Sequence, residues 1–166
     1  MLTVEVRGLR ELRNALLALP RRIARPLLNR SLMVGGRLIR DEARARVPLL
    51  RVPDRRRVRG ALRRAIHAGV ARPQGHAASV WVRVRPLTRG QIAAFKRRAG
   101  AGAQNPLDPF YWRWLEFGTS KMAARPFLRP AFEAKKEQAA RAIIADLRPR
   151  ILAEAEKLGR RTMGGL

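Results

Sequence analysis

Cysteine is absent from this chain of 166 residues, and its absence excludes three kinds of chemistry. Without thiols the protein has no disulfide framework, no thiolate nucleophile and no thiolate metal site. Long apolar runs are missing as well, because no uncharged stretch approaches the roughly 20 residues that a membrane helix requires. Residues 1 to 13 carry charge early and lack the apolar segment of a secretory signal. We therefore expect a soluble protein without membrane contact, belonging to a cytoplasm or to a particle assembled in one.

Acidic residues are scarce, since 12 Asp and Glu stand against 37 Lys and Arg, and the formal net charge is +25. GC-rich coding would explain why nearly all the bases are arginine, but it would not explain the shortage of acids. A polyanionic neighbour, either nucleic acid or an acidic protein surface, explains the imbalance, and we favour this interpretation. The charge is also uneven, because no acidic residue lies between Arg55 and Leu107.

Residues that could support catalysis or bind a metal are few. His67 and His76 are the two histidines, and neither has a pair of carboxylates beside it, whereas zinc generally requires four ligands. The serines lack a Gly-x-Ser-x-Gly context, and no GxxxxGK[ST] loop is present to hold phosphates. We therefore expect no enzyme, no metal and no cofactor.

Hydrophobic spacing predicts a strand and two helices in the first third of the chain. Alternation predicts a strand at residues 2–6, and regularly spaced leucines predict a helix that ends at Pro20. Pro26 is expected to open a second helix that ends at Val47-Pro48. We interpret Gly35-Gly36 inside it as close packing against a neighbouring element rather than as a hinge. The apolar face of this second helix is expected to contain Leu27, Ser31, Val34, Leu38 and Ala45.

A basic loop and a hairpin are expected next. The loop, residues 48–60, is either a solvated linker or a contact for DNA phosphate or an acidic partner, and neither interpretation is favoured. Strands are predicted at residues 61–71 and 78–85, joined by a turn at residues 73–77. The second strand alternates three valines with Trp81, Arg83 and Arg85. This pattern predicts an antiparallel sheet with one apolar and one basic face.

Residues 86–108 are expected to form an insertion between the sheet and the next block, of the kind that makes subunit or ligand contacts. Thr88 is placed to cap a helix over residues 89–98, with Ile92 and Phe95 turned inward. The end of this segment has no apolar anchor and predicts a loop.

The stretch from Phe110 to Phe132 holds two of the three tryptophans, the single tyrosine and four of the five phenylalanines, although aromatics make up only 5% of the chain. Aromatic residues bury the largest area per side chain, so we expect this block to build the core. Phe110, Trp114 and Phe117 lie at i, i+4 and i+7, which predicts a short helix with that face turned inward.

The end of this short helix has the chemistry of a turn. Gly118 is expected to adopt the left-handed conformation of a helix C′ residue, and Thr119-Ser120 to hydrogen-bond the turning backbone. Glu116 is expected to pair with Arg113 or Arg125, or to cap the turn through a backbone N–H.

A final helix is expected to begin near Pro130, where a missing N–H costs nothing, after Pro126 has favoured extended backbone before it. Pro149 should kink or end this helix, and residues 159–166 should form a loose tail. The elements together predict one α+β domain over residues 1–166, with a small antiparallel sheet packed against two N-terminal helices, a short aromatic helix and a long C-terminal helix. The apolar stripe of the final helix is expected to contain Phe132, Ala139, Ile143, Leu147 and Ile151.

Two blocks carry a resemblance to a known family. Glu116–Lys121 (EFGTSK) followed by Arg125–Ala131 (RPFLRPA) resembles the signature of the neck or tail-completion proteins of long-tailed, lambda-like bacteriophages, which join head to tail. Gly60–Ile66 resembles the Gly-x-Leu-Arg-x-x-Ile segment that follows a proline and leads into the family's sheet. The family's acidic-Thr pair before that glycine is replaced here by Arg57-Val58-Arg59. The signature residues are Glu116, Phe117, Gly118, Thr119, Ser120, Pro126, Phe127, Pro130, Gly60 and Leu62.

The resemblance implies a structural virion protein at the head–tail junction, with no enzymatic activity. It implies an oligomeric ring, six-fold if it is coaxial with the tail, that docks to adjacent neck, tail-terminator and tail-tube proteins. The alternative is a small basic nucleic-acid-binding protein, although no recognised binding motif is present. In the ring, the candidates for facing a partner or the DNA in the channel are Arg55, Arg56, Arg57, Arg59, Arg83 and Arg85.

Overall fold

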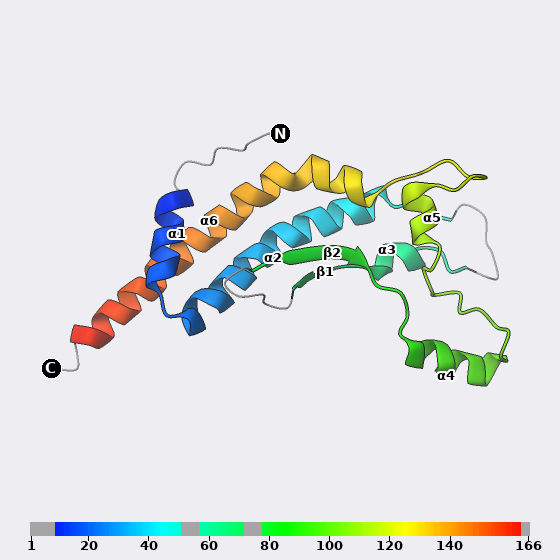
Figure 1. Cartoon of the computed structure of the whole chain (residues 1–166), viewed down its shortest axis with the longest axis horizontal. Helices are drawn as coiled ribbons and strands as arrows, with labels where there is room; N and C mark the ends of the chain where they lie inside the picture. Colours follow the sequence, from blue (N-terminus) through cyan, green and yellow to red (C-terminus); the bar gives the residue numbers. More distant parts are fainter. Residues whose placement is uncertain (1–8, 51–56, 72–77, 164–166) are drawn as a thin grey trace. The chain divides into compact units, whose positions relative to one another are not determined.

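A computed structural model describes residues 9–50, 57–71 and 78–163 (Figure 1). The elements are helices α1 (Leu9–Ala18), α2 (Arg21–Arg46), α3 (Ala61–Ala65), α4 (Arg89–Ala99), α5 (Trp112–Phe117) and α6 (Leu128–Met163), and strands β1 (Ile66–Val70) and β2 (Val80–Val84). The predicted α+β class, with an antiparallel hairpin and a long C-terminal helix, is confirmed. The strand predicted at residues 2–6 and the turn predicted at residues 73–77 lie outside the described residues.

The described chain packs as two compact units. Unit 1 takes residues from the ranges 1–38, 69–81 and 136–166, and unit 2 takes residues 39–68 and 82–135. Helices α2 and α6 and both strands contribute residues to each unit.

The core of unit 1 is aliphatic and comes from three helices. The leucine spacing predicted for the first helix is confirmed, because Leu12 of α1 and Leu19, directly after α1, are buried there. Helix α2 adds one leucine, and the distal part of α6 adds two residues that belong to the apolar stripe predicted for that helix. The buried members are Leu12, Leu19, Leu27, Leu147 and Ile151.

A buried polar contact joins α2 to α6 within unit 1. Ser31 is fully buried, and its Oγ donates a hydrogen bond to Oδ2 of Asp146 at 2.7 Å. Arg150 donates to both oxygens of the same carboxylate at 2.8 and 3.0 Å. The hydrogen bonds from Arg150 and then from Ser31 stabilise the charged form and lower the pKa of Asp146.

Helix α2 begins at Arg21, so the predicted start at Pro26 is wrong. The carbonyl oxygen of Pro20 already accepts the N–H groups of Ile23 at 2.8 Å and Ala24 at 3.0 Å. Pro26 therefore lies in the second turn of an established helix, where its ring removes one backbone hydrogen bond. The predicted end of the helix before Val47-Pro48 is confirmed.

The core of unit 2 gathers residues from both long helices, α3 and the hairpin. The face predicted for α2 is wrong at Ala45, which is exposed, because Ala43 is the alanine that faces the core. Phe127 is the one fully buried aromatic residue in this core. The buried members are Ala43, Val47, Leu62, Ile66, Val84, Phe127 and Ala131.

Strands β1 and β2 pair in one register. The N–H of Arg85 donates to the carbonyl oxygen of Ala65, and the N–H of Ala71 donates to that of Ser79, both at 2.8 Å. This register sets Gly69 opposite Trp81, and a Cβ on Gly69 would overlap the indole ring. Residues 61–65 were predicted as part of the first strand, but they form α3 instead.

Helix α4 is confirmed, together with its cap. The N–H of Gln91 donates to Oγ1 of Thr88 at 3.3 Å, and the N–H of Thr88 donates to Oε1 of Gln91 at 2.9 Å, which completes a capping box. No residue of α4 is buried, and the predicted inward residues Ile92 and Phe95 are only half-buried.

Helix α6 continues past Pro149 to Met163, so the expectation that residues 159–163 form a loose tail is wrong. Buried residues on both sides of this proline pack into the core of unit 1, and that packing maintains the helix despite one missing hydrogen bond.

The apolar stripe predicted for α6 is wrong at Phe132, which is 50% exposed because it lies one position outside the buried row. Among the described helices, none is long and apolar enough to span a membrane. The buried row recurs every fourth residue or multiple of four, at Phe127, Ala131, Ala139, Leu147 and Ile151.

Gly35 lies where α2 meets α6 in unit 1. A Cβ on Gly35 would lie 2.6 Å from Cδ1 of Ile143 and 3.2 Å from the carbonyl oxygen of Ala139. The close-packing interpretation is therefore confirmed at Gly35, which is buried.

We expect Gly35→Val to lower the free energy of unfolding by about 1–3 kcal/mol, because the added methyl groups overpack this contact. Gly90→Val is the matched control, since Gly90 lies in α4 and a Cβ there would meet no atom within 4 Å. The control should change stability by less than about 0.5 kcal/mol. Urea unfolding of the two variants measures the difference, and equal effects would contradict the contact.

Candidate functional site

The segments Glu116–Lys121 and Arg125–Ala131, which resemble a family signature, meet at the start of α6, and Glu116 connects them. This carboxylate is only 7% exposed. The N–H groups that it accepts belong to the first turn of α6, where they have no carbonyl partner within the helix. Glu116 thus caps a backbone, as one of the expected alternatives stated, but it caps the next helix rather than its own turn. Its Oε2 accepts the N–H groups of Phe127 at 2.8 Å and Leu128 at 3.0 Å, and its Oε1 accepts that of Arg129 at 3.0 Å.

Gly118 ends α5 with a φ of +74°, which confirms the predicted positive φ, but its ψ of −177° lies outside the predicted left-handed helical region. Its N–H donates to the carbonyl oxygen of Trp114 at 2.9 Å. A Cβ at Gly118 would lie 2.9 Å from the backbone of both Met122 and Ala124. Glycine is therefore required here twice, by the dihedral angle and by the space.

The chain then folds back on itself. Thr119 exchanges backbone hydrogen bonds with Met122 at 2.9 and 3.2 Å, and its Oγ1 accepts the N–H of Lys121 at 3.3 Å, while Ser120 is exposed at the tip. This confirms the predicted role of Thr119. The N–H of Arg125 then donates to the carbonyl oxygen of Leu115 at 2.7 Å, which closes the corner.

The prolines of the signature lie on each side of Phe127. Pro126 is exposed and precedes the fully buried Phe127. Pro130 lies in the first turn of α6, as predicted, where its missing N–H leaves no carbonyl unsatisfied. We call this arrangement of residues 115–130 the capped corner.

The aromatic face of α5 points outward, so its predicted direction is wrong. Trp114 is 49% exposed and Phe117 is 75% exposed. Phe110 contacts Trp114 edge-to-face, with ring centroids 5.5 Å apart. The opposite side of α5 has to face inward because it carries Glu116 to the start of α6. Tyr111, Trp112 and Leu115 pack against the core instead and are partly buried.

The second signature block forms a smaller corner. Gly60 has a φ of +77° and precedes α3, and Leu62 is 2% exposed in the core of unit 2. Because α3 is a single turn, Leu62 and the first residue of β1, Ile66, reach the same core.

The basic residues singled out from the sequence have different surroundings. Arg55 and Arg56 lie outside the described residues. The guanidinium carbon of Arg57 lies 4.7 Å from the centroid of the Tyr111 ring, and Arg59 is exposed. Burial raises the pKa of Tyr111, and the Arg57 charge partly opposes that shift. Arg83 of β2 and Arg85, directly after β2, are exposed, as the alternating pattern predicted.

Other arginines gather in unit 2 that were not singled out from the sequence. Burial, and then the charges of Arg44, Arg85 and Arg40, lower the pKa of His67. Arg40 and Arg44 are spaced i and i+4 on α2, and this spacing was a signal for a shared basic face. The arginine side chains therefore place positive charge close to His67 of β1.

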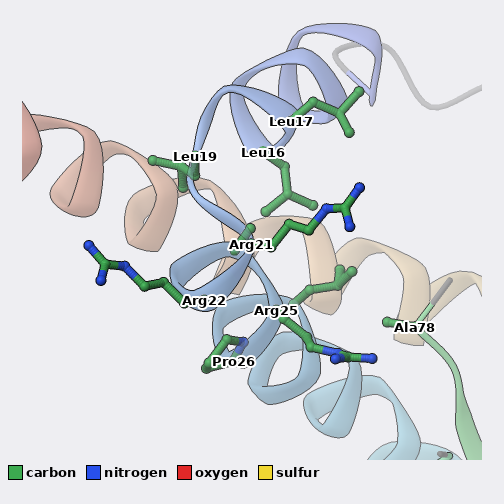
Figure 2. A pocket seen from close by; sticks show the side chains of 10 residues that line it. Leu16, Leu17, Leu19, Arg21, Arg22, Arg25, Pro26 and Ala78 are labelled. Atoms are coloured by element: carbon green, nitrogen blue, oxygen red, sulfur yellow. The ribbon is translucent and has the colours of Figure 1, made fainter. Parts of the chain in front are cut away.

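A groove of about 520 Å³ lies in unit 1 (Figure 2). Its walls are mainly apolar, and Leu17 among them is 66% exposed. Three arginines from the first turns of α2 also line it, and in Figure 2 Arg22 extends away from Arg21 and Arg25. The lining residues are Leu16, Leu17, Leu19, Arg21, Arg22, Ala24, Arg25, Pro26, Leu28 and Ala78.

Within the part of the chain that the structure describes, no three His, Asp or Glu side chains come close enough to hold a metal ion. No protein-family model matches the chain, and neither a curated protein nor a solved structure matches it.

Glu116→Gln should lower the free energy of unfolding by about 2–4 kcal/mol, because three backbone donors lose a charged acceptor in a buried place. Glu137→Gln removes the same charge from an exposed position of α6 and should be nearly neutral. Thermal and urea unfolding followed by circular dichroism compare the two, and a stability loss that is no larger at position 116 would refute the cap.

A comparison of Gly118→Ala with Gly100→Ala separates the free-energy cost of backbone strain from that of steric overlap. Both glycines have positive φ, but a Cβ at Gly100 would meet no atom within 4 Å. Gly100→Ala should cost about 1 kcal/mol through backbone strain alone, and Gly118→Ala should cost at least about 1 kcal/mol more. Chemical unfolding measures both changes, and a smaller cost at Gly118 would exclude the tight approach of the corner.

Proposed function

We propose that this protein is a structural component of a tailed bacteriophage, a neck or tail-completion protein that joins head and tail. It would act by assembling into a ring and docking to neighbouring neck, tail-terminator and tail-tube proteins. The observation that carries the proposal is the capped corner. The segments Glu116–Lys121 and Arg125–Ala131, which together resemble the family signature, are joined there, because Glu116 caps the helix that begins within the second segment.

The outward aromatic face supports a role in assembly. Trp114 and Phe117 place large apolar rings at the surface of unit 2, where the half-buried Phe110 contacts Trp114, and Phe132 is exposed on α6. Exposed aromatic side chains are enriched in protein interfaces and often dominate their energy. The sequence segments that resemble the family signature therefore lie beside exposed aromatic side chains that a contact between copies would bury.

A ring explains how one small chain can use two different surfaces. In a head-to-tail contact, a patch on one copy meets a different patch on the next, and closure repeats that contact around the axis. The aromatic face is one such patch, and the groove between α1 and α2 in unit 1 offers apolar area for another contact. Coaxial placement on a tail favours six-fold closure.

The proposal predicts that the protein self-associates through the aromatic face. Trp114→Ser with Phe117→Ser should weaken self-association by roughly 30-fold or more, because loss of a central aromatic anchor typically costs about 2 kcal/mol. Multi-angle light scattering across a concentration series measures the mass of each species. The matched control is Leu49→Ser with Leu107→Ser, two exposed apolar residues of the same unit.

A monomer at every concentration, which also fails to bind tail tubes of the phage whose genome carries this gene, would contradict the proposal. An equal loss in the control would exclude the aromatic face. A monomer that binds duplex DNA tightly at physiological salt would favour the alternative, a small basic nucleic-acid-binding protein.

A further inference from the structure

A cup on unit 2 is lined by charged side chains, and we propose that it binds a phosphodiester group of a nucleic-acid backbone. The cup has a volume of about 420 Å³ and is formed by Asp41, Arg44, Arg63 and Arg64. A phosphate requires positive charge and N–H donors, and a guanidinium group supplies both in one planar fork. The proposal does not rest on head–tail joining, because packaged DNA and free nucleic acid present the same chemical group.

Arg44 is held in position without a ligand. Its Nε and Nη2 donate to the carbonyl oxygen of Ile66 at 3.1 and 2.7 Å. The guanidinium group is thereby fixed at the wall of the cup, with Nη1 at 3.9 Å from Oδ1 of Asp41. A side chain that is already ordered loses little conformational freedom when it binds an anion.

Arg63 and Arg64 contribute charge that no carboxylate offsets among the described residues. Both side chains are exposed on the single turn of α3, and neither has an ion pair within the described part of the chain. Nη1 of Arg64 lies 3.5 Å from the position that a Cβ on Gly60 would occupy. This is an ordinary van der Waals distance, so the guanidinium group of Arg64 lies against the glycine turn before α3.

Asp41 is the acidic member of the lining, and it is already neutralised. Nε and Nη2 of Arg40 donate to its two carboxylate oxygens at 2.8 and 3.0 Å. Three arginines of the cup, together with Arg40 and less one aspartate, leave a net charge of about +3 at this site. The site therefore attracts anions despite its carboxylate.

The positive charge continues from the cup onto the hairpin. The register of β1 and β2 places His67 opposite Arg83 and on the same sheet face as Arg85. His67 lies within the influence of Arg40, Arg44 and Arg85, from two different elements. A nucleic-acid backbone carries one charge per nucleotide, so a row of cations beside a phosphate cup fits a backbone better than it fits a single small anion.

The lining favours a phosphate over an acidic peptide. Among the described residues, no apolar side chain lines the cup, so a peptide would find no described apolar surface there to bury. The groove of unit 1 has the opposite character, because apolar residues make up most of its lining. Backbone phosphates need no apolar contact and are commonly bound by arginine alone.

The test compares two adjacent pairs of arginines. Binding of a random-sequence 30-bp duplex DNA is measured by fluorescence anisotropy between about 50 and 200 mM salt for the full chain, for Arg63→Ala with Arg64→Ala, and for Arg97→Ala with Arg98→Ala. The second pair is exposed at the end of α4 and removes the same charge. Loss of two phosphate contacts should make the slope of log K against log salt less steep by about 1.8 and should weaken binding roughly tenfold.

The α4 pair should leave the slope nearly unchanged. Equal effects of the two double variants would overturn the proposal, because net charge alone would then explain binding. Asp41→Asn is a gain-of-binding variant, which should tighten binding and steepen the slope. Failure to do so would also count against the cup, and this variant keeps the test decisive if either double variant fails to fold.

The source of the phosphate is separated by three competitors at equal charge. If duplex RNA displaces the labelled DNA as strongly as unlabelled duplex DNA does, the site recognises the phosphodiester group that both share. If one of the two displaces it more strongly, the result supports the cup and identifies that nucleic acid as the source of the phosphate. Displacement by polyglutamate that exceeds both and depends on Arg63 and Arg64 would show an acidic protein ligand and overturn the proposal. None of these outcomes depends on self-association, so the test of head–tail joining remains separate.

Discussion

The carboxylate of Glu116 is the constraint on which the corner around it depends. A buried charge is tolerated only where hydrogen bonds replace water, and here three N–H groups of the first turn of α6 supply them. The same bonds satisfy donors that a helix always leaves without partners, and the negative charge matches the positive end of the helix dipole. The positive φ of Gly118 brings the chain back so that this contact can form. The start of α6 is thus fixed, and that helix then supplies buried residues to both cores.

Features that depend on neighbours in sequence could be predicted. Thr88 and Gln91 form their capping box because the two groups lie one helical turn apart, whatever the rest of the chain does. The positive φ of Gly118 could be predicted because helices commonly end at a glycine with positive φ. The alternation of β2 and the leucine spacing of α1 also identified buried sides correctly, since each pattern is long enough for its period to be clear.

Features decided by distant contacts could not be predicted. The aromatic spacing of α5 was clear, but the need to bury Glu116 turned the aromatic side outward, and its partners lie eleven to thirteen residues away. Residues 61–65 are too few to show a hydrophobic period, so their conformation is decided by the packing of Leu62 into the core of unit 2. The position of Pro26 is typical of the start of a helix, but α2 already begins directly after Pro20, whose carbonyl oxygen accepts the first N–H groups of the helix. The cup was missed because Arg44 and Arg63 come together only in the fold.

The shortage of acidic partners has a consequence for the isolated chain. Even if all 12 acidic residues paired one-to-one with the 37 bases, 37 − 12 = 25 positive charges would remain without a carboxylate of the same chain. Such an excess repels itself, opposes compaction and is screened only beyond about 8 Å at physiological ionic strength. The chain in solution must therefore carry an atmosphere of counterions. A polyanionic neighbour would release those ions, so that association and the stability of the folded chain would increase together through mass action.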